Sequence, residues 1–316
     1  MGFWSGYRAS LKPLDIEEPI DVYVHRPAGY VLARLCFHTP VTPNQITVGA
    51  IILGTFGGVL LAVELPYHLQ LGALCLFLST VFDCADGMLA RMRKTSSVFG
   101  RMLDGVADLF TISGAIIGAV TVMIRHYNPP WWHAAIVVAL SALTVVTSAF
   151  HTMGYDHYKN VYMRFTIPGS KEGDELPAAL ARYEEARARP MGLVRRTVWW
   201  IYLNFLQAQK DRVSGFDPFT TMHLDTLPPY DEARAAIYKK HAYAPMRVWR
   251  YFFGVGSMMI GFTISSAFGR PDIFLLWRLV VLNGILYLYL KPLQRQASQR
   301  AFAELGIAEH SSGAPA

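Results

Sequence analysis

The sequence predicts an all-α integral membrane protein, and three observations support this fold class. Hydrophobic residues make up 53% of the 316 residues and charged residues only 16%. With a mean hydropathy of +0.26, this balance is unusual for a soluble domain. Uncharged apolar runs recur at close to the roughly 20 residues that cross a bilayer, and basic residues gather in alternate loops. The chain is therefore expected to cross the membrane several times.

Residues 26–38, before the first apolar run, are expected to form an amphipathic helix along the membrane surface. Pro27 is typical of a helix start, and the basic residues of this segment can meet lipid phosphates. The next segment, Thr-Pro-Asn-Gln-Ile-Thr at 42–47, interrupts the amphipathic helical pattern. Its Thr42 or Asn44 can cap the helix that follows.

Six apolar runs are expected to be transmembrane helices. The second and third runs carry charged residues at the ends that face each other along the chain. The six runs span residues 45–63, 67–92, 98–123, 131–153, 247–269 and 272–290.

The distribution of Lys and Arg predicts the orientation of these helices. An even number of spans places both termini on one side, and the three short loops on the other side contain only two basic residues. The positive-inside rule then places the termini and the longer loops in the cytoplasm. The basic-poor loops are 64–68, 124–131 and 268–272, with Arg125 and Arg270.

A long polar segment separates the fourth and fifth runs. Residues 154–246 carry charges of both signs and repeated prolines, so we expect a solvated cytoplasmic insertion. The sequence thus divides into five expected segments: a cytoplasmic N-terminal segment at 1–41, helices one to four at 42–153, the insertion at 154–246, helices five and six at 247–291, and a cytoplasmic tail at 292–316.

Composition also excludes several classes of protein. Three cysteines, Cys36, Cys75 and Cys84, suggest neither a disulfide framework nor a metal-binding spacing. The net charge of +6 comes from basic residues spread beside apolar runs, without a basic and aromatic recognition motif, so a nucleic-acid partner is not expected.

Four aspartates lie within a 26-residue stretch of otherwise hydrophobic helix: Asp83, Asp86, Asp104 and Asp108. Spacings of three and four residues place each pair on one helix face. A turn near residues 93–97 would fold the two helices antiparallel, with both pairs roughly 15 Å from the turn at the helical rise. We therefore expect one carboxylate cluster, and such a cluster needs a compensating cation or a water-filled cavity at membrane depth.

The chemistry of this cluster favours hard divalent cations. Carboxylate oxygens are the ligands of Mg²⁺ and Mn²⁺, which also bind phosphate oxygens, whereas the absence of His and Cys partners argues against zinc. Gly87, Gly100 and Gly105 beside the aspartates would let a nucleotide or diphosphate approach the backbone closely.

Residues 83–108 resemble a known enzyme family. They match the pattern D-x2-D-G-x2-A-R-x8-G-x3-D-x3-D at every specified position, and this pattern is the signature of the CDP-alcohol phosphotransferase family. The six-span layout and the lead-in at 42–47 are also similar to the family. The insertion at 154–246 departs from compact members, which join the fourth and fifth spans more directly.

The resemblance implies roles for these residues. Asp83, Asp86 and Asp104 would hold two divalent ions, Mg²⁺ or Mn²⁺, that grip a donor diphosphate. Asp108 would complete the metal site and act as the base for the acceptor hydroxyl, with Asp104 beside it in the catalytic group. Gly87, Arg91 and Gly100 would line the CDP side of the site.

Three further residues invite a functional or a structural interpretation. Lys159 and Arg164, near the cytoplasmic end of the fourth span, can contact an anionic acceptor or donor phosphates, or can be ordinary flanking charges. Arg278 lies within the sixth span, where it marks a functional or pairing site unless it snorkels to the outer edge.

The expected function is a CDP-alcohol phosphotransferase of phospholipid biosynthesis in a bacterial inner membrane, with its site facing the cytoplasm. It would transfer phosphatidyl from CDP-diacylglycerol to an alcohol. The alternatives are a CDP-choline or CDP-ethanolamine type enzyme acting on diacylglycerol, and a non-catalytic relative. A prenyltransferase would need a second, distant aspartate motif, and a transporter would not need this spacing. The expected partners are a CDP-linked lipid donor, an alcohol acceptor and membrane lipids, and a homodimer is left open.

Overall fold

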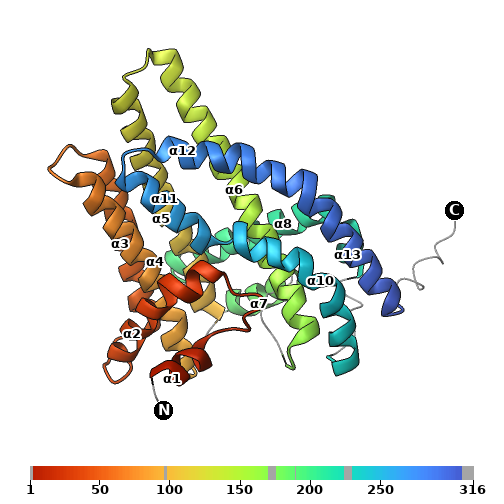
Figure 1. Cartoon of the computed structure of the whole chain (residues 1–316). Coiled ribbons are helices and arrows are strands. Elements are labelled where there is room, and N and C mark those ends of the chain that lie inside the picture. The colour runs from red at the N-terminus through yellow and green to blue at the C-terminus, as the bar shows by residue number, and fades with distance from the viewer. Residues whose placement is uncertain (1–2, 96–97, 170–175, 189, 224–229, 308–316) are drawn as a thin grey trace. The chain divides into compact units, whose positions relative to one another are not determined.

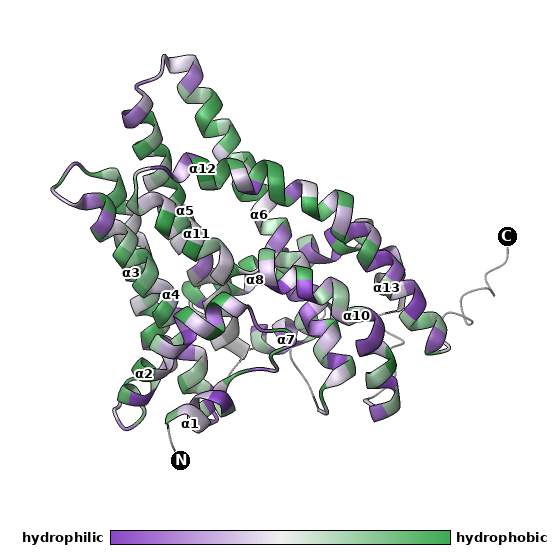
Figure 2. Ribbon diagram, in the orientation of Figure 1, coloured by the Kyte–Doolittle hydropathy of each residue, from purple (hydrophilic) through white to green (hydrophobic). Residues whose placement is uncertain are grey.

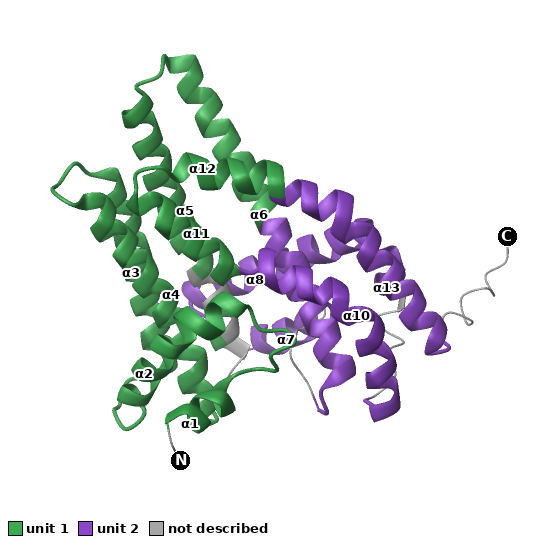
Figure 3. Cartoon of the chain, viewed as in Figure 1, with its two compact units in different colours: residues 1–148, 255–281 green, residues 149–254, 282–316 purple. Residues whose placement is uncertain are grey.

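The computed structural model describes residues 3–95, 98–169, 176–188, 190–223 and 230–307, and the regular elements in these ranges are all helices (Figure 1). The side chains at 98, 99, 101, 104–107, 222 and 223 are not described. Packing divides the chain into two units (Figure 3). Unit 1 comprises Met1–Ser148 and Val255–Val281, and unit 2 comprises Ala149–Gly254 and Leu282–Ala316.

Unit 1 begins with α1 (Phe3–Ser10), a π-helical turn η1 (Asp21–His25) and α2 (Arg26–Cys36). Pro27 lies in the first turn of α2, which confirms the helix predicted at this point. One face of α2 packs on α4 (His68–Arg93). A Cβ atom on Gly29 would lie 2.9 Å from the Cβ of Cys84. That α2 also lies along a membrane surface stays a prediction.

The first long apolar helix, α3 (Pro43–Ala62), begins with a capping box. The Thr42 hydroxyl accepts a hydrogen bond from the Gln45 amide at 3.3 Å, and the Gln45 side chain accepts one from the Thr42 amide at 2.9 Å. Both bonds satisfy amides that the start of a helix otherwise leaves unpaired. Of the two predicted caps, Thr42 is therefore the one in use.

Helix α3 packs against both α4 and α5 (Val98–Tyr127), and glycines allow these helices to come close. A Cβ atom on Gly58 would lie 2.2 Å from the carbonyl oxygen of Gly114 in α5. On the other side of α3, a Cβ atom on Gly57 would lie 2.9 Å from the carbonyl oxygen of Gly72 in α4. The backbones of the three helices are thus in direct contact.

The rest of unit 1 consists of the first part of α6 (Trp131–Thr166), α11 (Val255–Ala267), α12 (Pro271–Leu276) and the start of the π-helical segment η3 (Trp277–Leu282). Helix α11 packs on α4 and α12. Their shared apolar core contains buried side chains from α3, α4, α5, α11 and α12, among them Leu61, Leu76, Ala119, Phe262 and Leu275.

Unit 2 contains the second part of α6, followed by six further elements. They are α7 (Leu176–Arg187), α8 (Leu193–Phe216), α9 (Pro218–His223), α10 (Glu232–Phe252), the π-helical segment η4 (Ile285–Leu290) and α13 (Lys291–Glu304). Tyr158 stacks on Trp249, and Phe165 stacks on Tyr238. The segment expected to be a solvated insertion therefore contributes to a packed aromatic core.

Among the described residues, five helices are long and apolar enough to cross a membrane. They lie at Pro43–Ala62, His68–Arg93, Asp108–Tyr127, Trp131–Thr166 and Pro271–Glu304. The hydrophobic residues are most continuous along α3, α5, the start of α6 and the segment after α12, while hydrophilic residues gather on α13 (Figure 2). The chain is thus a multi-helix protein with the apolar spans of a membrane protein.

The span expected at 247–269 is not one continuous helix. Helix α10 ends at Phe252, and α11 starts at Val255 and has only 13 residues. At about 1.5 Å per residue, a helix of this length is shorter than the hydrocarbon core of roughly 30 Å. The last span is instead longer than expected, because helical structure continues to Glu304 rather than ending near residue 290.

Arg278 lies inside the last apolar span, and its side chain is only 2% exposed. Its Nε donates to the hydroxyl of Ser148 in α6 at 2.8 Å, and its guanidinium lies 5.9 Å from the centre of the Phe274 ring. The snorkelling alternative is therefore wrong, because Ser148 and Phe274 hold the arginine within the packed unit.

Candidate functional site

The two aspartate pairs predicted from the sequence lie on α4 and α5, the neighbours of the central helix α3. Asp83 of α4 and Asp108 of α5 line one small pocket, so the structure brings together the first and last aspartates of the motif. Helices α3, α4, α5 and α11 form the walls of this pocket: Ala50, Ser79, Thr80, Asp83, Asp108, Thr111, Ile112, Val255 and Met259.

Asp86 lies one helical turn beyond Asp83, and its side chain is only 6% exposed. Its carboxylate accepts a hydrogen bond from the hydroxyl of Thr47, in the first turns of α3. The same hydroxyl lies 3.2 Å from the carbonyl oxygen of Pro43. Thr47 thus ties the aspartate motif to the capped start of α3, a role that the motif spacing did not predict.

Asp104 lies in α5, one turn before Asp108. Its side chain is outside the described part of the structure, so its predicted place in the cluster stays a prediction. Among the side chains that the structure describes, no group of three His, Cys, Asp or Glu residues is placed to hold a metal. The described part of the site supplies two carboxylates around one pocket, and their oxygens are the donors that Mg²⁺ and Mn²⁺ take.

The predicted donor-binding residues lie towards the end of α4 and the start of α5. The guanidinium of Arg91 is exposed and lies along α4 beside Gly87, where a Cβ atom would be 3.5 Å from its Nη1. Gly87 and Arg91 therefore share one face, as their four-residue spacing predicts. Gly100 is in the first turn of α5.

Arg93, two residues after Arg91, has a structural role. Its Nη2 donates to the carbonyl oxygens of Phe37 at 3.0 Å and Thr39 at 2.8 Å, and other bonds reach Cys36 and Val41. The end of α4 is thereby attached to the segment that joins α2 and α3.

Lys159 and Arg164, the suggested phosphate contacts, lie on the part of α6 that belongs to unit 2. The ammonium group of Lys159 is 2.8 Å from the carboxylate of Asp156 and 5.4 Å from the centre of the Tyr155 ring. Asp156 also accepts a hydrogen bond from Asn160 at 3.2 Å. The structure thus shows Lys159 in a local ion pair, and the suggested phosphate contacts stay predictions.

Several pocket residues were not identified from the sequence. Ser79 and Thr111 lie four residues before Asp83 and three after Asp108, on the same helix faces, so this spacing would have found them. The Ser79 hydroxyl donates to the carbonyl oxygen of Ala50 at 2.7 Å and so ties α4 to α3. Val255 and Met259 come from α11, far along the chain, and no local pattern marks them.

Comparisons with known proteins fit this arrangement. Residues 40–167 match the model of the CDP-alcohol phosphatidyltransferase family. Phosphatidylinositol phosphate synthase of Corynebacterium glutamicum is 30% identical over 154 residues, which is 48% of this chain and 66% of that protein.

Two further relatives are similar over shorter regions. The bifunctional IPC transferase and DIPP synthase of Thermococcus kodakarensis is 30% identical over 135 residues, 42% of this chain and 30% of that protein. CDP-diacylglycerol–glycerol-3-phosphate 3-phosphatidyltransferase of Salmonella paratyphi A is 28% identical over 107 residues, 34% of this chain and 56% of that protein. The chain thus spans just under two thirds of the first relative's length and under one third of the second's.

Four apolar helices with an aspartate pocket between α4 and α5 define a helical membrane protein with an acidic site. The matched region contains α3, α4, α5 and α6 together with all four motif aspartates. Through this region, the chain is similar to the CDP-alcohol phosphatidyltransferase family.

Proposed function

We propose that the protein is a CDP-alcohol phosphotransferase of phospholipid biosynthesis, which transfers a substituted phosphate from a CDP-linked lipid to an alcohol and releases CMP. The observation that carries this proposal is the pocket shared by Asp83 and Asp108. These residues are the two ends of the family signature, and the chain folds so that they face the same space.

The four aspartates are proposed to hold two divalent ions, Mg²⁺ or Mn²⁺. The oxygen donors of Asp83 and Asp108 fit such ions, and Asp86 and Asp104 would contribute from the neighbouring turns. When bound, the ions would offset the charge of the donor diphosphate and of the leaving CMP. This part of the proposal is supported by the chemistry of the donor set and by the family motif.

Asp108 is proposed as the base of the reaction, with Asp104 beside it. A carboxylate in the pocket can accept the proton of an acceptor hydroxyl as its oxygen forms a bond to the transferred phosphorus. The bond between that phosphorus and the CMP oxygen breaks in the same transfer, and CMP leaves with the electron pair. Gly87, Arg91 and Gly100 are proposed to line the CDP side.

The proposed donor is CDP-diacylglycerol, which the name of the Salmonella relative contains. The names of the relatives suggest a phosphate-bearing alcohol, such as inositol phosphate or glycerol 3-phosphate, as the acceptor. Lys159 and Arg164 remain proposed contacts for an anionic acceptor. A CDP-choline type reaction with diacylglycerol as acceptor, and a non-catalytic relative, are the alternatives to be tested.

The proposed setting is a bacterial inner membrane, crossed six times, with both termini and the site facing the cytoplasm. The basic-poor loops support this topology. Since α11 is short, the fifth crossing would involve α11 together with neighbouring residues. A homodimer remains compatible with the proposal.

The experiment that tests the function is a panel of donors and acceptors. Purified protein in nanodiscs would receive CDP-diacylglycerol or CDP-choline, one alcohol at a time, and Mg²⁺ or Mn²⁺, with CMP and lipid products followed by mass spectrometry. The proposal expects CMP and a phosphatidyl product in equal amounts with one polar alcohol. Product from CDP-choline and diacylglycerol would favour the alternative enzyme, and release of CMP in no combination would leave a non-catalytic relative.

A further inference from the structure

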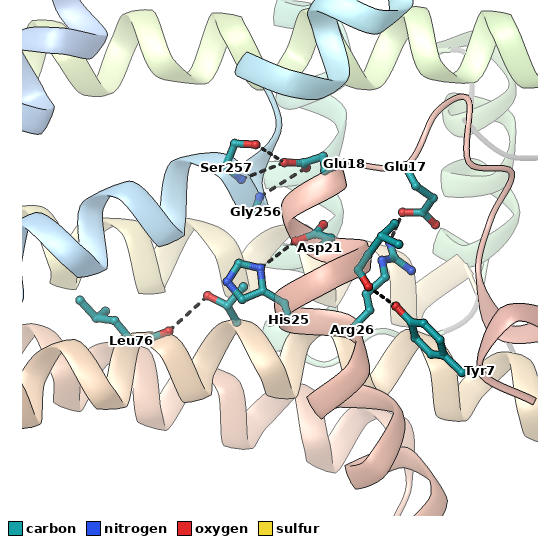
Figure 4. Close-up of polar contacts among 11 residues, drawn as sticks. Tyr7, Glu17, Glu18, Asp21, His25, Arg26, Leu76, Gly256 and Ser257 are labelled. Carbon is teal, nitrogen blue, oxygen red and sulfur yellow. Dashed lines mark hydrogen bonds and ion pairs between the residues drawn. The ribbon is translucent and has the colours of Figure 1, made fainter. Parts of the chain in front are cut away.

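Two consecutive glutamates in the N-terminal segment are almost completely buried. Glu17 is 4% exposed and Glu18 is 5% exposed. Glu17 accepts a hydrogen bond from the Lys12 amide at 2.9 Å and lies 2.8 Å from the guanidinium of Arg26, so its contacts stay within the N-terminal segment. Glu18 instead reaches α11, which follows more than 230 residues later along the chain (Figure 4).

The carboxylate of Glu18 binds the first turn of α11. It accepts hydrogen bonds from the Gly256 amide at 3.3 Å, the Ser257 amide at 2.8 Å and the Ser257 hydroxyl at 3.0 Å. The first amides of a helix have no partner within the helix, and their dipoles favour an acidic group. A side chain distant in sequence thus caps the start of α11.

Asp21 adds a second contact at the same helix start. A Cβ atom on Gly256 would lie 1.9 Å from the Oδ1 of Asp21, so only glycine fits against this carboxylate. The same oxygen is 2.8 Å from the Nδ1 of His25 (Figure 4). Burial and the neighbouring Asp21 raise the pKa of Glu18 to about 8. The two acids are therefore held together against an electrostatic cost.

The start of α11 also forms part of the candidate functional site. Val255, its first residue, and Met259, one turn later, line the pocket with Asp83 and Asp108. Only two residues separate α11 from the end of α10, and the amides of its first turn donate to Glu18. Its direction therefore depends on contacts such as those with Glu18.

The N-terminal segment is attached to the helix that carries the first aspartates. Helix α2 and η1 pack on α4, and Gly29 lies against Val81 and Cys84, which are two residues before and one residue after Asp83. The segment thus holds α4 with α2 and α11 with Glu18. These contacts fix the distance between the aspartates and the opposite wall of the pocket.

We propose that Glu18, supported by Asp21, is a positioning residue that holds the first turn of α11 so that Val255 and Met259 close the pocket opposite Asp83 and Asp108. Glu18 touches neither the aspartates nor, in this proposal, the substrates. Glu18 instead sets the position of α11, and the position of α11 determines the size of the pocket around the reacting groups. The part of the proposal that concerns turnover rests on the proposed function.

The test compares Glu18→Ala with Glu17→Ala, because the two residues are adjacent, equally buried and of the same type. Hydrogen exchange of the Gly256 and Ser257 amides reports the attachment of α11 independently of activity. Glu18→Ala should speed this exchange about fivefold, the usual ratio for a lost helix cap. It should lower kcat/KM for CMP release about 10- to 100-fold, the range for a displaced reacting geometry. Glu17→Ala should change neither the exchange nor kcat/KM in this way.

Two further variants keep the test decisive. Glu18→Gln retains an oxygen acceptor, so its amide exchange and its kcat/KM should both be close to those of the wild-type protein. If the charge of Glu18 were what matters, Glu18→Gln would instead behave like Glu18→Ala. Ser257→Ala removes one of the three bonds and should shift both readouts in the same direction by a smaller factor, even if Glu18→Ala does not fold.

Unchanged α11 exchange in Glu18→Ala would overturn the proposal, and so would faster exchange with unchanged kcat/KM. If the wild-type protein releases no CMP from any donor, the proposed function fails. The exchange comparison then still decides whether Glu18 positions α11.

Discussion

Units 1 and 2 bring their helices together with different residues. In unit 1, glycines remove side chains from the interfaces of α3 with α4 and α5, as at Gly58 and Gly114. In unit 2, large aromatic side chains fill the interfaces, and the rings of Phe165 and Tyr238 stack with their centres 4.1 Å apart. Glycine contacts fix the separation of backbones, whereas aromatic contacts bury large apolar areas. Unit 1 is thus suited to holding the motif residues of α4 and α5 at fixed distances.

The acidic side chains of the two units also differ in their surroundings. Asp217 of unit 2 is completely buried, and its Oδ2 accepts hydrogen bonds from the hydroxyls of Thr220 at 2.7 Å and Ser298 at 2.6 Å. Asp83 and Asp108 of unit 1 instead line a pocket. Burial of a carboxylate therefore does not by itself indicate function, and the space that the carboxylate faces is the better guide.

The largest expected effect separates these acids by function. Asp108→Asn should reduce turnover by about 10²- to 10⁴-fold, the usual range for losing a positioned base, and should leave donor binding measurable. Asp217→Ala should instead lower stability by about 1–3 kcal/mol for each buried hydroxyl left without its acceptor. CMP release and thermal unfolding of both variants in detergent would measure the difference. If the two folded variants lost turnover equally, Asp108 could not be assigned a catalytic role that Asp217 lacks.

The next effect tests the glycine contacts. Gly58→Ala places a Cβ atom 2.2 Å from a backbone oxygen, so α3 and α5 must separate, at a cost of about 1–3 kcal/mol. The control is Gly284→Ala in unit 2, where a helical glycine has no atom within 4 Å of the added carbon. The control should raise stability by about 0.5–1 kcal/mol. Unfolding midpoints that fall equally in both variants would show that the contact distance is irrelevant.

The smallest effect concerns two arginines in one turn of unit 1. Arg93→Lys should lower stability by about 1–2 kcal/mol, because a single ammonium cannot satisfy the carbonyls that the guanidinium contacts. Arg91→Lys should leave stability unchanged and weaken donor affinity about tenfold, if Arg91 lines the CDP side in a bidentate manner. Thermal unfolding and donor titration together test this pair. A stability loss at position 91 without an affinity loss would make Arg91 a structural residue as well.

Local features of the fold could be predicted from the sequence, because their causes are local. The apolar runs predicted at 45–63, 67–92 and 131–153 begin within two residues of long apolar helices. Thr42 caps α3, as its spacing to Gln45 predicts. The motif spacing also predicted that Asp83 and Asp108 would face the same region.

Features that depend on distant contacts could not be predicted in this way. The apolar run at 247–269 gave no sign of the break after Phe252. The burial of Arg278 depends on Ser148, 130 residues earlier, and the cap of α11 depends on Glu18. Val255 and Met259 line the pocket only because α11 packs on α4. In each case the partner residue has no fixed sequence spacing from the group that it holds.

The central claim is that the pocket of Asp83 and Asp108 is a metal-dependent site for a CDP-linked donor. The most direct measurement is a calorimetric titration of CDP-diacylglycerol into the wild-type protein with Mg²⁺ and with EDTA, repeated on Asp83→Asn and on Asp217→Ala. The account predicts that the wild-type protein and Asp217→Ala bind the donor only when the metal is present, and that Asp83→Asn binds it at least tenfold more weakly, because a charge that offsets the ion is lost. Donor binding that persists in EDTA, or is unchanged in Asp83→Asn, would contradict it.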